Sequence, residues 1–447
     1  LGRFPGRSRE KSERRTVMQE AARKPARAIV AAVQLPSASD LEFDASLTEL
    51  RQLAKTLGIE VVGRFTQKRA SFQAAAYLGT GKREELRALV EAERANVVLI
   101  DHEISPSQTF TLEKELGCQV MDRTMVILEI FYRHARSRAA RAQVEIARLG
   151  YMAPRLREAA KQAGPKDRAR SGTGGRSGGE SHGELDRRKI RDRIAELQKE
   201  LDATDLGRKT QRAKRQERQG LARAALVGYT NAGKSTLMRA LTGNQVLVAD
   251  KLFATLDTTV RALHPESVPR VLVSDTVGFI KNLPHGLVAS FKSTLDEALE
   301  AALLCHVVDA SDPGFERQLE VTEEVLAEIG AKAVPRLLVF NKIDRGGKEE
   351  ELRGALLAKY PSSIVMSARR EGDIAKLREA IIAFFERDLI EAEIFLPWSA
   401  QNRRGEIFSS CKVLEERADG EGAFLRVRGE SEAVKRLRKQ FGRVKAK

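Results

Sequence analysis

Cysteine is scarce in this sequence, with three residues, Cys118, Cys305 and Cys411, among 447. They lie far apart, and neither a C-x-x-C motif nor a pair of neighbouring histidines accompanies them. This pattern supports neither a disulfide framework nor a zinc site. A reducing compartment suits such a chain, so we expect a cytoplasmic protein.

Long apolar runs are also missing. No stretch approaches the roughly 18 residues that a membrane-spanning helix requires, and the arginine-rich start lacks the apolar core of a signal peptide. We therefore expect no membrane span, and peripheral attachment to a membrane stays open. The chain begins at Leu1, and we expect either a non-standard start codon or an alternative start at Met18.

Positive charge is plentiful but unevenly placed. The net charge is +16, yet residues 221–389 hold roughly 21 basic against 23 acidic side chains. The surplus lies in the flanks, with about 11 against 3 in residues 132–170 and about 9 against 2 in residues 426–447. Basic surface beside a neutral central region predicts a polyanionic partner, most simply RNA. The alternative is that these helix faces are merely solvated.

One stretch carries the clearest chemical signal. After an apolar run that ends at Val227, the spacing G-x-x-x-x-G-K-S predicts a strand, a phosphate-binding loop and a helix. Backbone N–H groups and the helix N-terminus would face the anion. Lys234 would reach the β- and γ-phosphates, and the Ser235 hydroxyl would ligate Mg²⁺. The expected phosphate-binding residues are Gly228, Tyr229, Thr230, Asn231, Ala232, Gly233, Lys234 and Ser235.

A second stretch completes the phosphate and metal site. Apolar Val271–Val273 predicts a strand that ends in Asp275-Thr276-Val277-Gly278. The Asp275 carboxylate would lie near Mg²⁺, directly or through water, and the Gly278 N–H near a γ-phosphate. Lys234 and Gly278 are therefore candidate catalytic residues.

Two further loops would select the base. The run Leu337–Phe340 precedes Asn341-Lys342-Ile343-Asp344, and Ile364–Met366 precedes Ser367-Ala368-Arg369. The Asp344 carboxylate can accept both the N1–H and the exocyclic amine of guanine, which adenine does not offer. A backbone N–H of the second loop suits guanine O6. These motifs, in order at the carboxyl ends of strands, predict a hydrolase that binds GTP and GDP on a Ras-like fold.

The whole chain reads as an α/β multidomain protein. We expect five segments: a disordered basic leader (1–27), a small parallel α/β domain (28–124), a helical arm with a glycine-rich loop and linker (125–220), a Ras-like GTPase domain (221–389) and a small C-terminal α+β subdomain (390–447). Within the first domain, Gly79-Thr80-Gly81-Lys82 imitates a phosphate loop but lacks its first glycine and the following Ser or Thr. We interpret it as a turn before a helix that begins at Arg83.

The arm is predicted from two helical patterns. Met125 to about Arg157 predicts one long helix, and apolar residues from Leu185 to Leu201 predict a second. Residues 164–183 between them are too rich in glycine for a core. The pattern favours an antiparallel arm that carries this loop to a partner, and a linker hairpin is the alternative. Near the C-terminus we expect two short strands, Cys411–Leu414 and Phe424–Val427, and a basic helix.

Beyond these motifs, the chain resembles the HflX family of translational GTPases over about residues 28–430. The resemblance rests on residues 101–106 (Asp-His-Glu-Ile-Ser-Pro), 116–124 (Leu-Gly-Cys-Gln-Val-Met-Asp-Arg-Thr), 253–257 (Phe-Ala-Thr-Leu-Asp) and 275–280 (Asp-Thr-Val-Gly-Phe-Ile). It implies binding to the large ribosomal subunit and its RNA, with the arm's loop near the peptidyl-transferase centre. It also implies GTP-linked dissociation or rescue of stalled ribosomes.

The same resemblance implies a switch segment. Its nucleotide contacts would come from Phe253, Ala254, Thr255, Leu256 and Asp257, with Thr255 as the catalytic residue on Mg²⁺ and Thr259 as the alternative. The sequence departs from the family pattern in two places: residues 176–184 differ from the usual glycine loop, and Thr258 replaces a usual proline.

Two positions bear on how GTP would be hydrolysed. Phe279 stands where Ras-like proteins carry a water-orienting glutamine, so we expect slow hydrolysis that depends on a partner. Asn231 is similar to the asparagine through which some GTPases bind an activating K⁺, and a loop-stabilising role is the alternative.

Three functions stay open from the sequence. The first is a ribosome-splitting GTPase, which we expect to be a monomer. The second is a GTPase of ribosomal subunit assembly. The third is a regulatory GTP switch that binds a protein effector.

Overall fold

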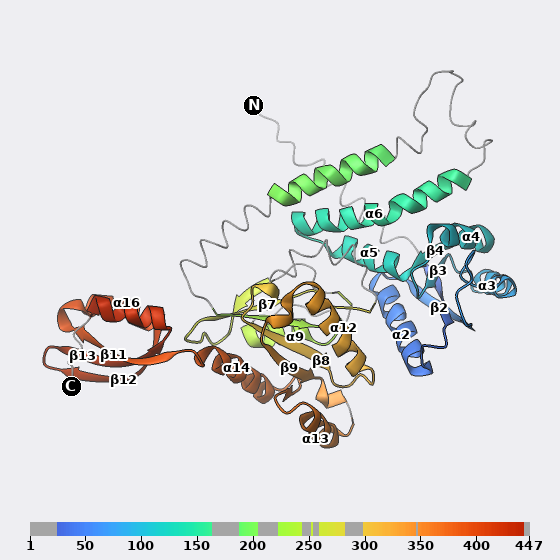
Figure 1. Cartoon of the computed structure of the whole chain (residues 1–447). Helices are drawn as coiled ribbons and strands as arrows, with labels where there is room; N and C mark the ends of the chain where they lie inside the picture. Colours follow the sequence, from blue (N-terminus) through green and yellow to red (C-terminus); the bar gives the residue numbers. More distant parts are fainter. Residues whose placement is uncertain are drawn as a thin grey trace, which may run out of the picture. The chain divides into compact units, whose positions relative to one another are not determined.

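The computed structural model describes residues 25–162, 187–203, 222–243, 252–253, 259–281, 298–345 and 347–441 (Figure 1). The chain divides into two compact units, one of Leu1–Ile130 with Arg148–Ile190 and one of Phe131–Ala147 with Arg191–Lys447. The described residues form three sheets. Within them, no helix is both long and apolar enough to cross a membrane.

The first sheet is parallel, with the strand order β2-β1-β3-β4. Its elements are β1 (Arg27–Gln34), α2 (Asp40–Thr56), β2 (Glu60–Lys68), α3 (Thr80–Ala92), β3 (Val97–Ile100), α4 (Pro106–Leu116) and β4 (Gln119–Asp122). Right-handed crossovers place α2 on one face and α3 and α4 on the other. The central strands β1 and β3 are therefore buried almost throughout. Because α3 begins at Thr80, residues 80–82 form its first turn, and the expected start at Arg83 is wrong.

The long helix expected from Met125 to Arg157 is in fact two. α5 (Arg123–His134) and α6 (Arg138–Gln162) are separated at residues 135–137. The Ser137 hydroxyl oxygen accepts from the Ala140 N–H at 3.1 Å, and the Ser137 carbonyl accepts from the Arg141 N–H at 3.0 Å. These bonds cap a new helix N-terminus, so the prediction of a single helix is wrong.

The second helix of the arm covers residues 187–203. Ion pairs join it to α6, from Arg138 to Glu200 at 3.2 Å and from Arg193 to Glu145 at 2.9 Å. Arg138, at the start of α6, pairs near the end of the second helix, whereas Glu145, further along α6, pairs with the earlier residue Arg193. The two helices therefore run antiparallel. The glycine-rich loop and the linker, in residues 163–186 and 204–221, lie outside the described residues.

The second sheet has six strands in the order β10-β9-β8-β5-β7-β6. Its strands are β5 (Ala222–Gly228), β6 (Thr259–Ala262), β7 (Val271–Asp275), β8 (Leu303–Asp309), β9 (Arg336–Asn341) and β10 (Ile364–Val365), of which only β6 pairs antiparallel. Its helices are α9 (Lys234–Thr242), α12 (Phe315–Glu328), α13 (Glu349–Lys359) and α14 (Glu371–Glu386), with a short η2 (Ile343–Arg345) after β9. The carboxyl ends of the parallel strands meet at one edge, as the expected α/β fold of this domain requires.

The third sheet is antiparallel, with the order β11-β13-β12. β12 (Cys411–Asp419) and β13 (Gly422–Gly429) extend the two expected strands, and α16 (Ser431–Phe441) is the expected basic helix. The sheet also contains β11 (Ile390–Pro397), and α15 (Arg404–Ser410) precedes β12, so the prediction of only two strands is wrong. In β11, buried Ala392, Ile394 and Leu396 alternate with more exposed residues. This period of two is the signal that reveals the strand. The domain boundaries stay a prediction.

Candidate active site

Two glycines shape the loop between β5 and α9. Gly228 has φ +142°, and a Cβ there would overlap the carbonyl oxygen of Val307. Gly233, at φ +100°, is the N-cap of α9, and a Cβ there would overlap the Asn341 amide. Both backbone conformations also disfavour side chains. The loop therefore lies close against the neighbouring β8 and against the loop after β9.

Lys234 opens α9, and its ammonium turns back over the loop. Nζ donates to the carbonyl oxygens of Gly228 at 3.0 Å and Tyr229 at 2.8 Å. Burial lowers the pKa of this lysine to about 8, and the nearby Asp275 carboxylate opposes that shift. An anion beside the ammonium would favour its charged form, so the geometry suits a phosphate ligand.

Ser235 and Asp275 bring a hydroxyl and a carboxylate together. The Ser235 hydroxyl donates to Asp275 Oδ2 at 2.8 Å, and Asp275 is almost fully buried at the end of β7. Oxygen donors of this kind suit Mg²⁺. A Cβ on Gly278 would come within 3.0 Å of Lys234 Nζ and 2.9 Å of Thr230 Cα. Only the bare backbone of Gly278 fits there, so these residues form a cradle that fits a metal-bound phosphate.

Residues 276–279 are joined to the phosphate loop through their backbone. The Thr230 N–H donates to the Phe279 carbonyl at 2.7 Å, and the Phe279 N–H donates to the Gly228 carbonyl at 3.1 Å. The Thr276 hydroxyl donates to the Leu226 carbonyl at 2.7 Å. Phe279 is 1 % exposed, so its ring is part of the core and cannot orient water. Other predicted site residues buried here are Tyr229, Ala232 and Val277.

Asn341 connects three of the predicted loops. Its Nδ2 donates to the Ala232 carbonyl and its Oδ1 accepts from the Ala368 N–H, both at 2.9 Å. The side chain is 1 % exposed. The phosphate loop, the end of β9 and the loop after β10 are thus held together by one amide, as the order of the motifs predicts.

Asp344 and the Ser367–Arg369 loop form the rest of the predicted base-binding region. Asp344 lies in η2 next to buried Ile343, and its side chain is 20 % exposed and 3.7 Å from Arg369. The Ser367 N–H donates to Asp373 Oδ2 at 2.9 Å. The Asp344 carboxylate is therefore accessible, while the neighbouring loop is fixed by its own hydrogen bonds.

No motif includes Asp309, yet the structure places it in this site. Asp309 is the last residue of β8, and its Oδ2 pairs with Lys342 Nζ at 2.7 Å. One signal in the sequence could have identified Asp309. It is a carboxylate at the carboxyl end of a strand, and that strand lies next to one that leads into a predicted ligand-binding loop.

Phe253 is the part of the expected switch segment that the structure describes. Its ring packs edge-on against Phe131 with centroids 4.5 Å apart, and its carbonyl oxygen lies 3.0 Å from His134 Nδ1. Both partners belong to α5, an association that the sequence did not predict. Ala254, Thr255, Leu256 and Asp257 lie outside the described residues, so the role of Thr255 stays a prediction.

Comparisons with known proteins identify the family. Models of a GTP-binding GTPase N-terminal region, a GTP-binding GTPase middle region and a 50S ribosome-binding GTPase match residues 44–132, 134–215 and 223–342. A curated GTPase HflX from Gluconacetobacter diazotrophicus is 51 % identical, over 93 % of this chain and 97 % of that protein. The chain belongs to the HflX family of GTPases.

A second curated relative supports this family membership. The GTPase HflX of Caldanaerobacter subterraneus subsp. tengcongensis is 41 % identical over 94 % of this chain and 95 % of its own. A crystal structure of a GTP-binding protein from Sulfolobus solfataricus in complex with GDP matches 80 % of this chain and 98 % of its own, at 24 % identity and a TM-score of 0.42. As an HflX-family GTPase with a phosphate loop, the protein hydrolyses GTP. P-loop GTPases generally use Mg²⁺, which the Ser235–Asp275 pair fits.

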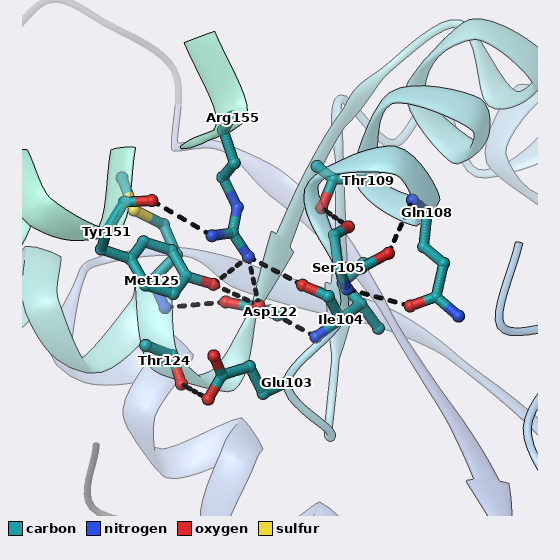
Figure 2. Close-up of polar contacts among 10 residues, drawn as sticks. All are labelled: Glu103, Ile104, Ser105, Gln108, Thr109, Asp122, Thr124, Met125, Tyr151 and Arg155. Atoms are coloured by element: carbon teal, nitrogen blue, oxygen red, sulfur yellow. Dashed lines mark hydrogen bonds and ion pairs between the residues drawn. The ribbon is translucent and has the colours of Figure 1, made fainter. Parts of the chain in front are cut away.

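The HflX-like residues of the first domain form a buried polar cluster around Asp122 (Figure 2). Its Oδ1 accepts from the Met125 N–H at 2.9 Å, and its Oδ2 accepts from the Ile104 N–H at 3.2 Å and from Arg155 at 2.9 Å. Arg155 also donates to the Ile104 carbonyl at 2.9 Å and stacks over the Tyr151 ring at 3.6 Å. Asp122 therefore caps α5 and holds the second half of α6 on the loop after β3, a structural role.

Proposed function

We propose that this protein binds the large ribosomal subunit and couples GTP binding and hydrolysis to dissociation or rescue of stalled ribosomes. The observation that carries the proposal is family membership, together with the match of residues 223–342 to a model described as a 50S ribosome-binding GTPase. The positive charge of residues 132–170 and 426–447 supports a partner rich in phosphate.

The same proposal assigns roles within the site. The backbone of residues 228–235 and the Lys234 ammonium bind the phosphates, and Ser235 and Asp275 hold Mg²⁺, with Thr255 as a further ligand. Bound Mg²⁺ would neutralise negative charge on the β- and γ-phosphates. Lys234 and the Gly278 N–H stabilise charge on the γ-phosphate, while Asp344 and the Ala368 region bind guanine.

Hydrolysis should depend on the partner, because the buried Phe279 ring supplies no group that orients water. We expect the isolated protein to turn over slowly and large subunits to accelerate it by about a thousandfold or more, the scale of GTPase activation in trans. Phosphate release under single-turnover conditions measures this. Lys234→Ala should show no stimulated rate. Equal rates of GTP hydrolysis with and without large subunits would contradict the proposal that hydrolysis depends on the partner.

Potassium belongs to the same proposal. Asn231 is exposed, at φ +59°, so its side chain is available to a cation beside the phosphates. We expect subunit-stimulated hydrolysis to be several-fold faster in K⁺ than in Na⁺, and Asn231→Ala to abolish that difference. If the wild-type rates are equal in both salts, Asn231 only shapes the loop.

Gradient sedimentation tests the ribosomal role. With a non-hydrolysable GTP analogue, the protein should sediment with mature large subunits, and light scattering should show 70S particles splitting when it is added. Sedimentation only with precursor particles would favour a role in subunit assembly. Indifference to ribosomes and RNA would favour a regulatory switch that binds a protein effector.

A further inference from the structure

Lys342 stands at the centre of a polar network between β8, β9 and the phosphate loop. Its Nζ donates to the Asn231 carbonyl at 2.6 Å and to Asp309 Oδ2 at 2.7 Å. Its backbone has φ +66°, a conformation that a residue with a side chain keeps only where its surroundings hold it. These contacts therefore determine where the Asn341–Asp344 loop lies.

Asp309 is itself fixed in place. Its Oδ1 accepts from the Ser311 N–H at 3.0 Å and from the Ser311 hydroxyl at 2.6 Å. The pair with Lys342 is shielded from water, with 13 % of the lysine side chain and 16 % of the aspartate side chain exposed. Shielding makes such a pair stronger than one on the surface.

The carboxylate also balances charge inside the site. Lys342 and Lys234 both donate to carbonyl oxygens of the phosphate loop, Lys342 to that of Asn231 and Lys234 to those of Gly228 and Tyr229. Without Asp309, two ammonium groups would lie near each other with less negative charge beside them. Lys342 would then tend to move away from the phosphate loop.

We propose that Asp309 is a positioning residue for guanine-nucleotide binding, whose carboxylate holds Lys342 against the Asn231 carbonyl and so holds the base-binding loop on the phosphate loop. Asp309 acts through Lys342 rather than by touching the nucleotide. The inference rests on the proposed nucleotide site and is independent of the ribosomal role.

A double-mutant cycle in the full-length protein tests this. Asp309→Asn, Lys342→Ala and the double variant are compared by the affinity and dissociation rate of fluorescent GDP and GTP analogues. We expect Asp309→Asn to weaken both nucleotides about tenfold, the scale of a lost charge-assisted hydrogen bond. Because Asp309 acts through Lys342, the double variant should bind no more weakly than Lys342→Ala alone.

Two further measurements separate positioning from general damage. The preference for guanine over xanthine nucleotides should not change in Asp309→Asn, since Asp344 is intact. Asp312→Asn is the matched control: this carboxylate, in the loop that follows β8, accepts from the Gly314 N–H at 2.8 Å and from Gln318 at 2.7 Å. It should leave nucleotide affinity unchanged.

Three results would overturn the inference. The Asp309→Asn variant could bind nucleotide as tightly as the wild type. Alternatively, the loss of affinity in Asp309→Asn could add to the loss in Lys342→Ala, which would mean that Asp309 acts separately from Lys342. In either case the nucleotide site itself would still stand. If Lys342→Ala leaves affinity unchanged, the assignment of the Asn341–Asp344 loop fails together with the inference.

Discussion

Asp344→Asn is expected to move the nucleotide preference from guanine to xanthine. The carboxylate can accept both the N1–H and the exocyclic amine of guanine, whereas an amide accepts one and presents its own N–H groups to the other. Losing a charge-assisted pair costs about 1.5–3 kcal/mol, or roughly 10- to 150-fold in affinity. Xanthine carries an oxygen in place of the amine and can accept from the new amide.

Competition between GDP and XDP against one fluorescent nucleotide measures the change. Asp388→Asn is the matched control, because it makes the same chemical substitution at an exposed position after α14. That variant should keep the wild-type preference. Unchanged GDP affinity in Asp344→Asn would mean that this loop does not bind the base.

The sequence allows a candidate nucleotide site to be proposed residue by residue, because the chemistry of such a site demands fixed residue types within continuous stretches. Gly228 and Gly233 illustrate this, since side chains at these positions would meet Val307 and Asn341. Asp309 could not be predicted in the same way. Its contact with Lys342 arises because Asp309 pairs with Asn341 across β8 and β9, and strand register is a property of the folded sheet.

The errors in the fold have similar causes. The apolar period of α5 continues across the break into α6, so periodicity alone cannot show that Ser137 caps a new helix. In the first domain, the residues around Asp101 and Asp122 resemble the family pattern, but the sequence does not reveal their structural role. Their purpose appears only when β3, β4, α2 and α6 bring residues distant in sequence together.

Arg123→Met is expected to destabilise the first sheet strongly without affecting nucleotide binding. Arg123 is 2 % exposed, and its guanidinium donates to Asp101 at 3.1 Å and to Glu49. Asp101 is itself buried and accepts from the Ser46 hydroxyl at 2.7 Å. Methionine fills similar space but removes the cation from beside two carboxylates. Breaking a buried ion pair in this way costs about 3–5 kcal/mol.

Hydrogen exchange of the β1 and β3 amides in the full-length chain measures this loss, since a protein of several domains does not unfold in one step. Arg87→Met is the matched control: Arg87 pairs with Glu91 on α3 with 62 % of its side chain exposed. Losing the Arg87–Glu91 pair should cost less than about 1 kcal/mol.

Combining Arg123→Met with Asp101→Asn and Glu49→Gln should restore much of the protection from hydrogen exchange, because no unbalanced charge then remains buried. GDP affinity should be the same in every variant, since these residues and the phosphate loop belong to different compact units. Exchange in Arg123→Met as slow as in Arg87→Met would show that the buried charges contribute little to this sheet.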